Sequence, residues 1–165
     1  GQLRLGVVTD SQDMDGQVLE EHACDAVDAE TLRQAMSTFV GDLYQTPPMV
    51  SAIKHKGVPL YKLARKGREV PREPRLVHLY DFLLHDWSPP LGTFSVACGK
   101  GTYVRTLCHD LGRKLGCGGA LQSLRRTRSG TLAVEDALPL DQVLALDKDR
   151  LAEHIIPYYR YLNDR

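Results

Sequence analysis

The stretch that decides the fold is Gly99-Lys100-Gly101-Thr102-Tyr103-Val104-Arg105-Thr106. It joins an alternating strand pattern, which places Phe94, Val96 and Cys98 on one face, to a helical pattern. The apolar positions of that helix are Val104, Leu107, Cys108, Leu111 and Leu115. A glycine-rich turn between a strand and a helix lets a ligand approach the backbone, and it leaves the first N–H groups of the helix free to bind an anion.

The same turn places Tyr103 and Arg105 at the start of the helix. A tyrosine ring stacks on planar groups, and a guanidinium holds a carboxylate or a phosphate through two hydrogen bonds. An ordinary helix N-terminus, with Arg105 in a surface ion pair, is the simpler alternative. The turn alone does not distinguish a ligand site from an ordinary helix start, so the rest of the chain must be considered.

Charge is distributed unevenly along a chain whose formal net charge is zero, with 21 basic and 21 acidic residues. Residues 45–75 and residues 100–130 each carry a net charge of +6, whereas the first 44 residues carry −7. Two basic segments in an otherwise acidic chain indicate a polyanion site, because phosphate contacts gain affinity from counterion release. Two solvated helical faces are the alternative.

Length and cysteine usage exclude several classes of protein. A chain of 165 residues is long enough to bury a core, and no stretch approaches the ~20 apolar residues that cross a membrane. The four cysteines, at irregular spacing, form neither a disulfide framework nor a zinc pattern. They are Cys24, Cys98, Cys108 and Cys117. We expect free thiols, and we expect no metal at Cys108-His109.

The first third of the sequence predicts a hairpin and a helix. Leu3–Val8 has the pattern of a strand, and a polar turn from Thr9 to Gly16 leads to a second strand at Gln17–Glu20. The carboxylates of this turn do not meet the register of a calcium loop. Asp28 caps a helix that we expect Gly41 to end. Its apolar positions are Leu32, Ala35, Met36 and Phe39.

Residues 45–75 predict a long, basic and partly irregular segment. Thr46-Pro47-Pro48 prevents a helix at its start. We expect a short strand at Val50–Lys54, a turn at Lys56-Gly57, and a helix from Leu60 to Lys66 that follows Pro59 and ends at Gly67. The segment is too polar to be core, and such segments are typically functional or mobile.

The remaining elements predict an α+β fold with a mixed, largely antiparallel sheet and flanking helices. A strand from Arg75 to Trp87 turns back into the strand that ends at Cys98, and a helix over Thr102–Leu115 ends at Gly116. We place His78 at a half-buried position, on a face formed by Leu76, His78, Tyr80, Phe82 and Leu84. Residues 120–126 follow as a strand, and a leucine-rich acidic helical tail ends in Tyr158-Tyr159-Arg160-Tyr161.

Three segments, taken together, resemble the TruB-type tRNA pseudouridine synthases. The first runs from Leu5-Gly6 through Thr9-Asp10 and Asp13 to Gly16. The second begins Gln45-Thr46-Pro47-Pro48-Met49-Val50-Ser51-Ala52-Ile53-Lys54 and continues through Val70-Pro71-Arg72 to Arg75. The third comprises Lys100–Thr106, Asp110-Leu111-Gly112 and Leu124-Arg125-Arg126. These segments span nearly all of residues 3–130 in the order and spacing of that family.

The resemblance implies an isomerase that turns a flipped-out uridine of the tRNA T-loop into pseudouridine, without cofactor or metal. It implies that Arg105 pairs with the catalytic aspartate, that Tyr103 belongs to the active-site motif, and that Leu124 packs near the flipped base. Residues 45–75 match a loop that clamps the T-arm. The residues expected to bind RNA are Lys54, Lys56, Tyr61, Arg65, Arg68, Arg72, Lys100, Arg125 and Arg126.

The sequence also departs from the family. The Gly-x-Leu-Asp-Pro motif, which holds the catalytic aspartate, is absent from residues 1–165 and is expected before Leu3. The tyrosine that stacks on the target base is expected before Gly1. Val50 stands where a tyrosine is usual, and Gly99 stands where a serine is usual. We therefore expect this chain alone to be inactive, with catalysis belonging to the parent protein.

The resemblance sets further expectations for organisation and partners. Residues 1–137 are expected to form the C-terminal part of the catalytic domain and residues 138–165 a helical tail, with no separate RNA-binding domain after it. We expect a cytoplasmic monomer that binds the tRNA T-arm and no membrane. One alternative is a catalytically inactive tRNA-binding module or tRNA chaperone. A phosphate-handling domain that uses the Gly99–Thr102 turn is disfavoured, because no P-loop or dinucleotide motif appears.

Overall fold

The computed structural model describes residues 1–159 and divides into two compact units, Gly1–Leu124 and the residues from Arg125 onward. The division follows Leu124, whereas the sequence analysis placed it after residue 137. Residues 125–137 fold among themselves, because β10 (Arg128–Ser129) pairs with β11 (Leu132–Ala133) rather than with the main sheet. The predicted Arg160 and Tyr161 of the tail lie outside the described residues.

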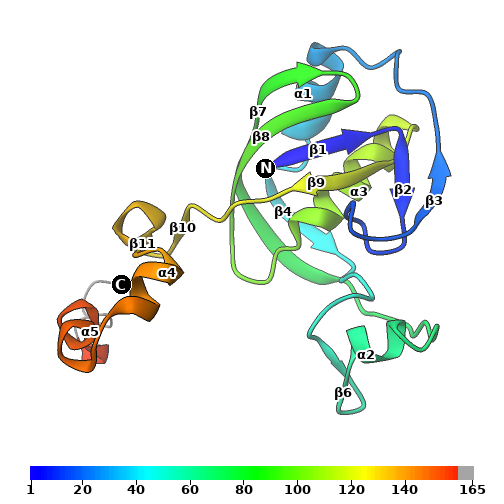
Figure 1. Cartoon of the computed structure of the whole chain (residues 1–165). Coiled ribbons are helices and arrows are strands. Elements are labelled where there is room, and N and C mark those ends of the chain that lie inside the picture. Colours follow the sequence, from blue (N-terminus) through cyan, green and yellow to red (C-terminus); the bar gives the residue numbers. More distant parts are fainter. Residues whose placement is uncertain (160–165) are drawn as a thin grey trace. The chain divides into compact units, whose positions relative to one another are not determined.

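A five-stranded sheet organises the first unit (Figure 1). Its strands lie in the order β4 (Gly41–Gln45), β7 (Arg75–Ser88), β8 (Leu91–Cys98), β1 (Gln2–Leu5) and β9 (Gly119–Ser123). Every neighbouring pair is antiparallel. The predicted α+β class with an antiparallel sheet and flanking helices is confirmed.

Two helices, α1 (Ala29–Ser37) and α3 (Val104–Leu115), bury their apolar faces against this sheet. The predicted helical positions Leu32, Met36, Leu107 and Leu111 are all buried, together with Leu3, Leu5, Leu79, Phe82 and Phe94. Burying such side chains stabilises a fold by about 1.5–3 kcal/mol each. The core therefore anchors α3, which follows directly after the turn at residues 99–103.

The ends of the two helices test the predicted caps. The carboxylate of Asp28 accepts a hydrogen bond from the Thr31 N–H at 2.7 Å, as expected of an N-cap. Gly116 ends α3 with φ of +78°, as predicted. Gly41 does not end α1, which stops at Ser37. Gly41 is instead the first residue of β4, where its φ of +102° is one that glycine adopts readily.

The face predicted for the Arg75–Trp87 strand is wrong in its first half. Val77 and Leu79 are buried, whereas Leu76, His78 and Tyr80 are exposed. The pairing of β7 with β8 shifts register between Leu79 and Asp81, and one extra residue in a strand reverses the faces of all residues before it. The exposed His78 Nδ1 lies 2.6 Å from the Asp42 carboxylate, so it is not the half-buried core histidine that the sequence indicated.

The predicted first hairpin is present. β2 (Val7–Thr9) pairs with β3 (Val18–Glu21), and residues 10–17 connect them. Gly6, at φ of +82°, divides the single predicted strand into β1 and β2. A Cβ at Gly6 would lie 2.7 Å from the carbonyl oxygen of His22, so the chain passes here without room for a side chain.

Residues 46–74 leave the sheet between β4 and β7, and we call them the insertion. They contain β5 (Lys54–His55), β6 (Val58–Pro59) and the short helix α2 (Leu60–Ala64). The predicted strand at Val50–Lys54 is absent, because the pairing begins only at Lys54. The predicted turn is present, with φ of +47° at Lys56 and +83° at Gly57. The helix begins after Pro59 as predicted but ends at Ala64 rather than Lys66.

The second unit is small. After the β10–β11 hairpin it contains a 3-10 turn (Val134–Asp136) and the helices α4 (Leu140–Ala145) and α5 (Lys148–His154). None of its described residues is buried. Across the described part of the whole chain, no helix combines the length and apolarity needed to cross a membrane.

Candidate active site

The first turn of α3 brings Arg105 against a carboxylate from the opposite end of the sequence. Arg105 Nη1 donates to Asp13 Oδ2 at 3.0 Å, and each of the two side chains is 24% exposed. Among the described residues, Asp13 is the carboxylate with which Arg105 pairs. Arg105 is therefore a partly buried residue with a fixed partner, which the surface ion pair of the simpler alternative would not require.

The loop between β2 and β3 holds Asp13 in place. The Thr9 hydroxyl donates to the Asp13 carbonyl oxygen at 2.7 Å, and the Ser11 hydroxyl donates to Asp13 Oδ1 at 2.7 Å. Gln12 adopts φ of +67°, and its Oε1 accepts from the Thr106 hydroxyl at 2.7 Å. A residue other than glycine in this region is strained, so its bonds to neighbouring elements must compensate. Two successive residues of the loop, Gln12 and Asp13, therefore bond to side chains in the first turn of α3.

Tyr103 is held through its backbone by a buried glutamine. Its N–H donates to Gln45 Oε1 at 2.7 Å, and its carbonyl oxygen accepts from Gln45 Nε2 at 3.1 Å. Gln45 is 2% exposed and is the last residue of β4, directly before the insertion. The start of α3, with Tyr103 and Arg105, is thereby fixed by one residue of the sheet and by two residues of the hairpin loop.

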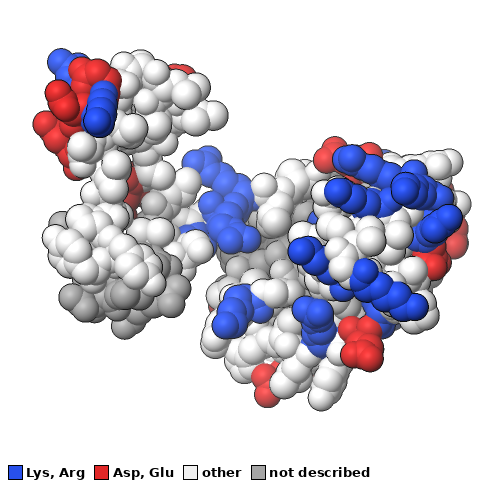
Figure 2. Space-filling model, turned by 90° about the horizontal axis from the view of Figure 1, so that it is seen from below, with Lys and Arg blue, Asp and Glu red and all other residues white. Residues whose placement is uncertain are grey.

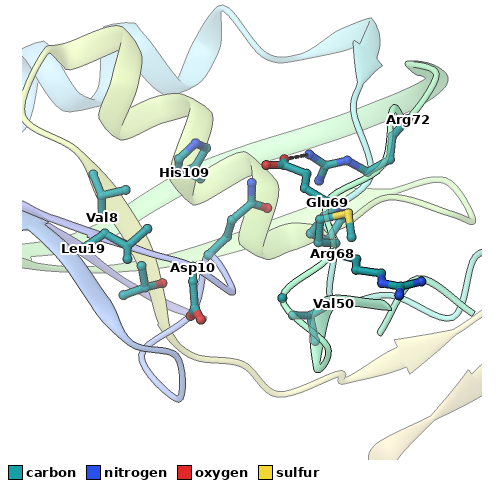
Figure 3. A pocket seen from close by; sticks show the side chains of 14 residues that line it. Val8, Asp10, Leu19, Val50, Arg68, Glu69, Arg72 and His109 are labelled. Atoms are coloured by element: carbon teal, nitrogen blue, oxygen red, sulfur yellow. Dashed lines mark hydrogen bonds and ion pairs between the residues drawn. The ribbon is translucent and has the colours of Figure 1, made fainter. Parts of the chain in front are cut away.

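A pocket of about 390 Å³ lies beside these contacts, between the β2–β3 hairpin, α3 and the insertion (Figure 3). Gln12 lines it, and Gln12 also bonds to α3, so the pocket adjoins the Arg105–Asp13 pair. Tyr103, Arg105 and Leu124 do not line it. Its polar lining comprises Thr9, Asp10, Gln12, Arg68, Glu69, Arg72 and His109.

Two adjacent residues of α3 differ in their environments. Cys108 is fully buried in the core, and burial raises the pKa of its thiol to about 12, so the thiol stays protonated. Burial also lowers the pKa of His109, partly offset by the nearby Asp110 carboxylate. His109 lines the pocket, and its Nδ1 is buried without a hydrogen-bond partner among the described residues.

The predicted RNA-binding residues of the insertion divide into exposed and engaged groups. Lys54, Lys56, Arg65 and Arg68 are exposed, as is Lys100 in the turn before α3. Lys and Arg side chains gather over one face of the first unit (Figure 2). Arg72 is instead engaged within the chain, donating to the Pro47 carbonyl oxygen at 3.1 Å and to the Glu69 carboxylate at 2.7 Å.

The other predicted positions have distinct surroundings. The Arg65 guanidinium lies 5.6 Å from the centre of the Tyr61 ring, in cation–π contact. Leu124 follows β9 at the end of the first unit and is 51% exposed. Arg125 and Arg126 are exposed and belong to the second unit. The structure therefore brings Arg105 and Tyr103 together on one turn.

Comparison with known families decides the relationship. A sequence model described as the N-terminal domain of TruB family pseudouridylate synthase matches residues 1–104. The chain belongs to the TruB family. A second model, described as the C-terminal domain of tRNA pseudouridylate synthase B, matches residues 105–163. The resemblance stated from the three sequence segments is confirmed.

Curated TruB-family relatives cover most of this chain. A protein of Opitutus terrae named tRNA pseudouridine synthase B is 50% identical over 160 residues, which are 97% of this chain and 66% of the relative. Proteins of the same name from Geotalea uraniireducens and Syntrophotalea carbinolica are each 48% identical, and the matches cover 84% and 90% of this chain, respectively. This chain spans between 45% and 66% of the length of these three relatives.

Solved structures show the same fold at lower identity. A chain from the crystal structure of a Cbf5–Nop10–Gar1 complex matches with a TM-score of 0.68 and 23% identity, over 99% of this chain and 42% of that one. A chain from the structure of an H/ACA RNP bound to a substrate RNA containing 2′-deoxyuridine matches with a TM-score of 0.58 and 21% identity, over 96% of this chain and 36% of that one. At this identity the likeness shows the fold.

Sequence reasoning missed the roles of Asp13 and Gln45. Both stand in the segments that carry the family resemblance, but their partners lie 92 and 58 residues away in the chain. A polar side chain at the end of a strand is a weak signal for Gln45, since it gives no partner. For Asp13, the density of carboxylates between Asp10 and Asp15 hid the one that faces α3.

Proposed function

We propose that this chain is part of a tRNA pseudouridine synthase that isomerises a flipped-out uridine of the T-loop to pseudouridine. The observation that carries the proposal is the partly buried pair between Arg105, in the first turn of α3, and Asp13. A guanidinium has five N–H donors, so Arg105 can be fixed by Asp13 and still hold a second carboxylate. Family membership supports this assignment, because the matched relatives are named tRNA pseudouridine synthase B.

The chemistry follows from the bonds that change. The bond from the sugar C1′ to the base N1 breaks, the base rotates, and a bond from C1′ to C5 forms. The C5 hydrogen leaves as a proton to water, and N1 takes up a proton from water, so the product is an isomer of uridine. We propose that the catalytic carboxylate is an aspartate outside residues 1–165. Arg105 keeps that carboxylate ionised in a dry pocket, since a nearby positive charge lowers the pKa of an acid. Tyr103 and Leu124 would contact the flipped base. No step requires a metal or cofactor.

We propose that the insertion binds the tRNA T-arm. Its exposed Lys54, Lys56, Arg65 and Arg68, with Lys100 of the neighbouring turn, provide charge for phosphate contacts. Tyr61 offers a ring for stacking. Arg72 would act indirectly, since its bonds to Pro47 and Glu69 hold the insertion together. We place the protein in the cytoplasm, where it would bind its tRNA as a monomer.

The test uses a T-arm RNA hairpin tritiated at C5 of its loop uridine, because formation of the C1′–C5 bond releases that hydrogen to water. We expect the full-length protein, meaning one that contains this chain and spans its relatives' length, to release tritium equally with and without a metal chelator. We expect residues 1–165 alone to release none.

Each other outcome has a definite meaning. Tritium release by residues 1–165 alone would show that the catalytic carboxylate lies within this chain. Tight hairpin binding by the full-length protein without any release would favour the tRNA-binding module over the enzyme. Release that stops on addition of the chelator would contradict the metal-free mechanism.

A further inference from the structure

The helix α3 begins without a capping side chain of its own. Its N-cap residue is Tyr103, whose side chain makes no capping hydrogen bond. The hydroxyl of the preceding Thr102 donates back to the Gly99 carbonyl oxygen at 2.9 Å and so does not cap the helix. The free N–H groups of a helix start need partners, and uncapped starts fray. The first turn of α3 nevertheless bears Arg105, whose position the proposed reaction requires.

Gln45 supplies the missing connection from 58 residues away. Its amide accepts from the Tyr103 N–H at 2.7 Å and donates to the Tyr103 carbonyl oxygen at 3.1 Å. That carbonyl oxygen also accepts the first bond of the helix, from the Leu107 N–H at 3.2 Å. An amide is the side-chain group that both donates and accepts in this geometry, whereas a carboxylate only accepts when ionised. Gln45 thus fixes both backbone groups of the N-cap residue.

Gln45 is itself held in place by the sheet. Gln45 is 2% exposed, and its backbone pairs with Arg75 across β4 and β7. Buried hydrogen bonds are costly to leave unmade, about 1–3 kcal/mol for each unsatisfied group. Gln45 is also the last residue of β4, so the insertion departs from the same residue whose side chain holds the turn.

We propose that Gln45 is a positioning residue of the active site, which sets the orientation of Tyr103 and Arg105 by clamping the backbone at the start of α3. This inference rests on the proposed function. It goes beyond it by assigning a role to a residue that touches neither the uridine nor the catalytic carboxylate. Loss of the clamp should slow the chemical step while leaving the RNA contacts of the insertion in place.

The experiment compares Gln45→Met and Gln45→Asn in the full-length protein. Methionine keeps the length of the side chain but cannot hydrogen-bond to Tyr103, and asparagine keeps the amide but is one methylene too short to reach both groups. We expect the single-turnover rate with saturating T-arm hairpin to fall about 10- to 100-fold in Gln45→Met, since small displacements of reacting groups cost this much. The single-turnover rate of Gln45→Asn should lie between those of the wild type and Gln45→Met. The affinity of both variants for the hairpin should stay within about threefold of the wild-type affinity.

Trp87→Phe is the control, because it removes a partly buried side-chain hydrogen bond outside the turn, from Trp87 Nε1 to the Val27 carbonyl oxygen at 3.0 Å, whereas Gln45→Met removes the two bonds to Tyr103. It should lower stability comparably and leave the single-turnover rate unchanged. A rate loss in Gln45→Met no larger than in Trp87→Phe would overturn the proposal. So would a weaker hairpin affinity at an unchanged rate, which would place Gln45 in RNA binding instead.

Hydrogen exchange at the Tyr103 amide tests the clamp by itself, without depending on the proposed enzymatic activity. We expect this amide to exchange at least about tenfold faster in both Gln45 variants and at the wild-type rate in Trp87→Phe. Unchanged exchange in the Gln45 variants would overturn the clamp whatever the activity. If the wild-type protein isomerises no uridine but the exchange rate rises as expected, the proposed function fails while the clamp itself stands.

Discussion

The turn at the start of α3 and the insertion are built from different kinds of contact. The turn is tied to distant parts of the chain, through Arg105 to Asp13, 92 residues away, and through Tyr103 to Gln45, 58 residues away. The insertion relies mainly on local contacts, such as Arg72 with Glu69, three residues apart. Its longest side-chain bond, from Arg72 to Pro47, still stays within the insertion.

This difference matches the two tasks that we assign to the regions. A reaction at one carbon atom requires groups held within fractions of an ångström, and contacts from several elements of the core provide that. Binding to the phosphates of an RNA requires exposed charge that adjusts to its partner, and its energy depends little on exact geometry. We therefore expect substitutions in the turn to act on rate and substitutions in the insertion to act on affinity.

Arg105→Lys should produce the largest effect. Lysine keeps the positive charge but loses the planar fork that reaches Asp13 and a second carboxylate together. We expect the single-turnover rate of the full-length protein to fall at least about 100-fold, with hairpin affinity within a few-fold of wild type. The measurements are tritium release at saturating RNA and a binding titration on the same preparations.

Arg113→Lys is the control for this change, because Arg113 lies on the same helix and is exposed. It should leave both the rate and the affinity unchanged. A near-normal rate in Arg105→Lys, with weaker RNA binding, would make Arg105 a phosphate contact and would place the turn in the same class as the insertion.

A triple substitution, Lys54→Ala, Lys56→Ala and Arg65→Ala, should produce a smaller effect of the other kind. These bases are exposed, so replacing them removes charge that can neutralise phosphates without disturbing the core. The slope of log affinity against log salt should flatten by up to about 0.7–0.9 for each phosphate that is no longer neutralised, and the rate at saturating RNA should not change. Binding titrations at several salt concentrations measure the slope.

The matched control substitutes three exposed bases outside the insertion, namely Arg33, Arg113 and Lys114, by alanine. This variant has the same change in net charge and should keep the wild-type slope. Equal flattening in both variants would mean that the protein binds RNA through its overall charge. An unchanged slope in the insertion variant would mean that its basic side chains face only water and contact no phosphate.

The sequence predicted the elements of the turn well because their signals are local. Apolar spacing at Leu107 and Leu111 placed α3 in the core, and Gly116 marked its end. The tight turn of the insertion at Lys56-Gly57 was predicted equally well. Periodicity and turn residues report on neighbours within a few positions, and these features depend on nothing further away.

The sequence could not predict what depends on distant partners. The register shift after Leu79 reversed the expected face of Leu76 and Tyr80, because only the pairing with β8 reveals an extra residue. The pairing of Arg105 with Asp13, and the bonds from Gln45 to Tyr103, likewise require the folded sheet to bring them together. Local signals therefore predicted the elements around the turn but not the contacts that hold it, which come from several elements and which the proposed chemistry requires.

His109→Asn should produce the smallest effect, at the boundary between the two regions. Burial lowers the pKa of His109 in the folded protein below its ordinary value of 6.5. The unfolded chain therefore takes up a proton at this position at higher pH than the folded chain does. The contribution of the neutral His109 to the free energy of unfolding is fully present above pH 6.5 and is lost as the pH falls below that value. Between about pH 7.5 and about pH 5.5, we expect the free energy of unfolding measured in urea to fall less in His109→Asn than in the wild type.

The cause of this shift can be tested through the insertion, which shares the pocket with His109. Gln45 pairs with Arg75 across the sheet, so an Asn-Gly turn can replace residues 46–74 and close β4 onto β7 as a hairpin. If the insertion keeps water from His109, this variant should lose the same part of the pH dependence as His109→Asn, and combining the two changes should add nothing. His85→Asn, at an exposed histidine of β7, should keep the wild-type profile. A profile unchanged by removal of the insertion would show that α3 and the hairpin alone bury His109, and that the insertion stands apart from the core in solution.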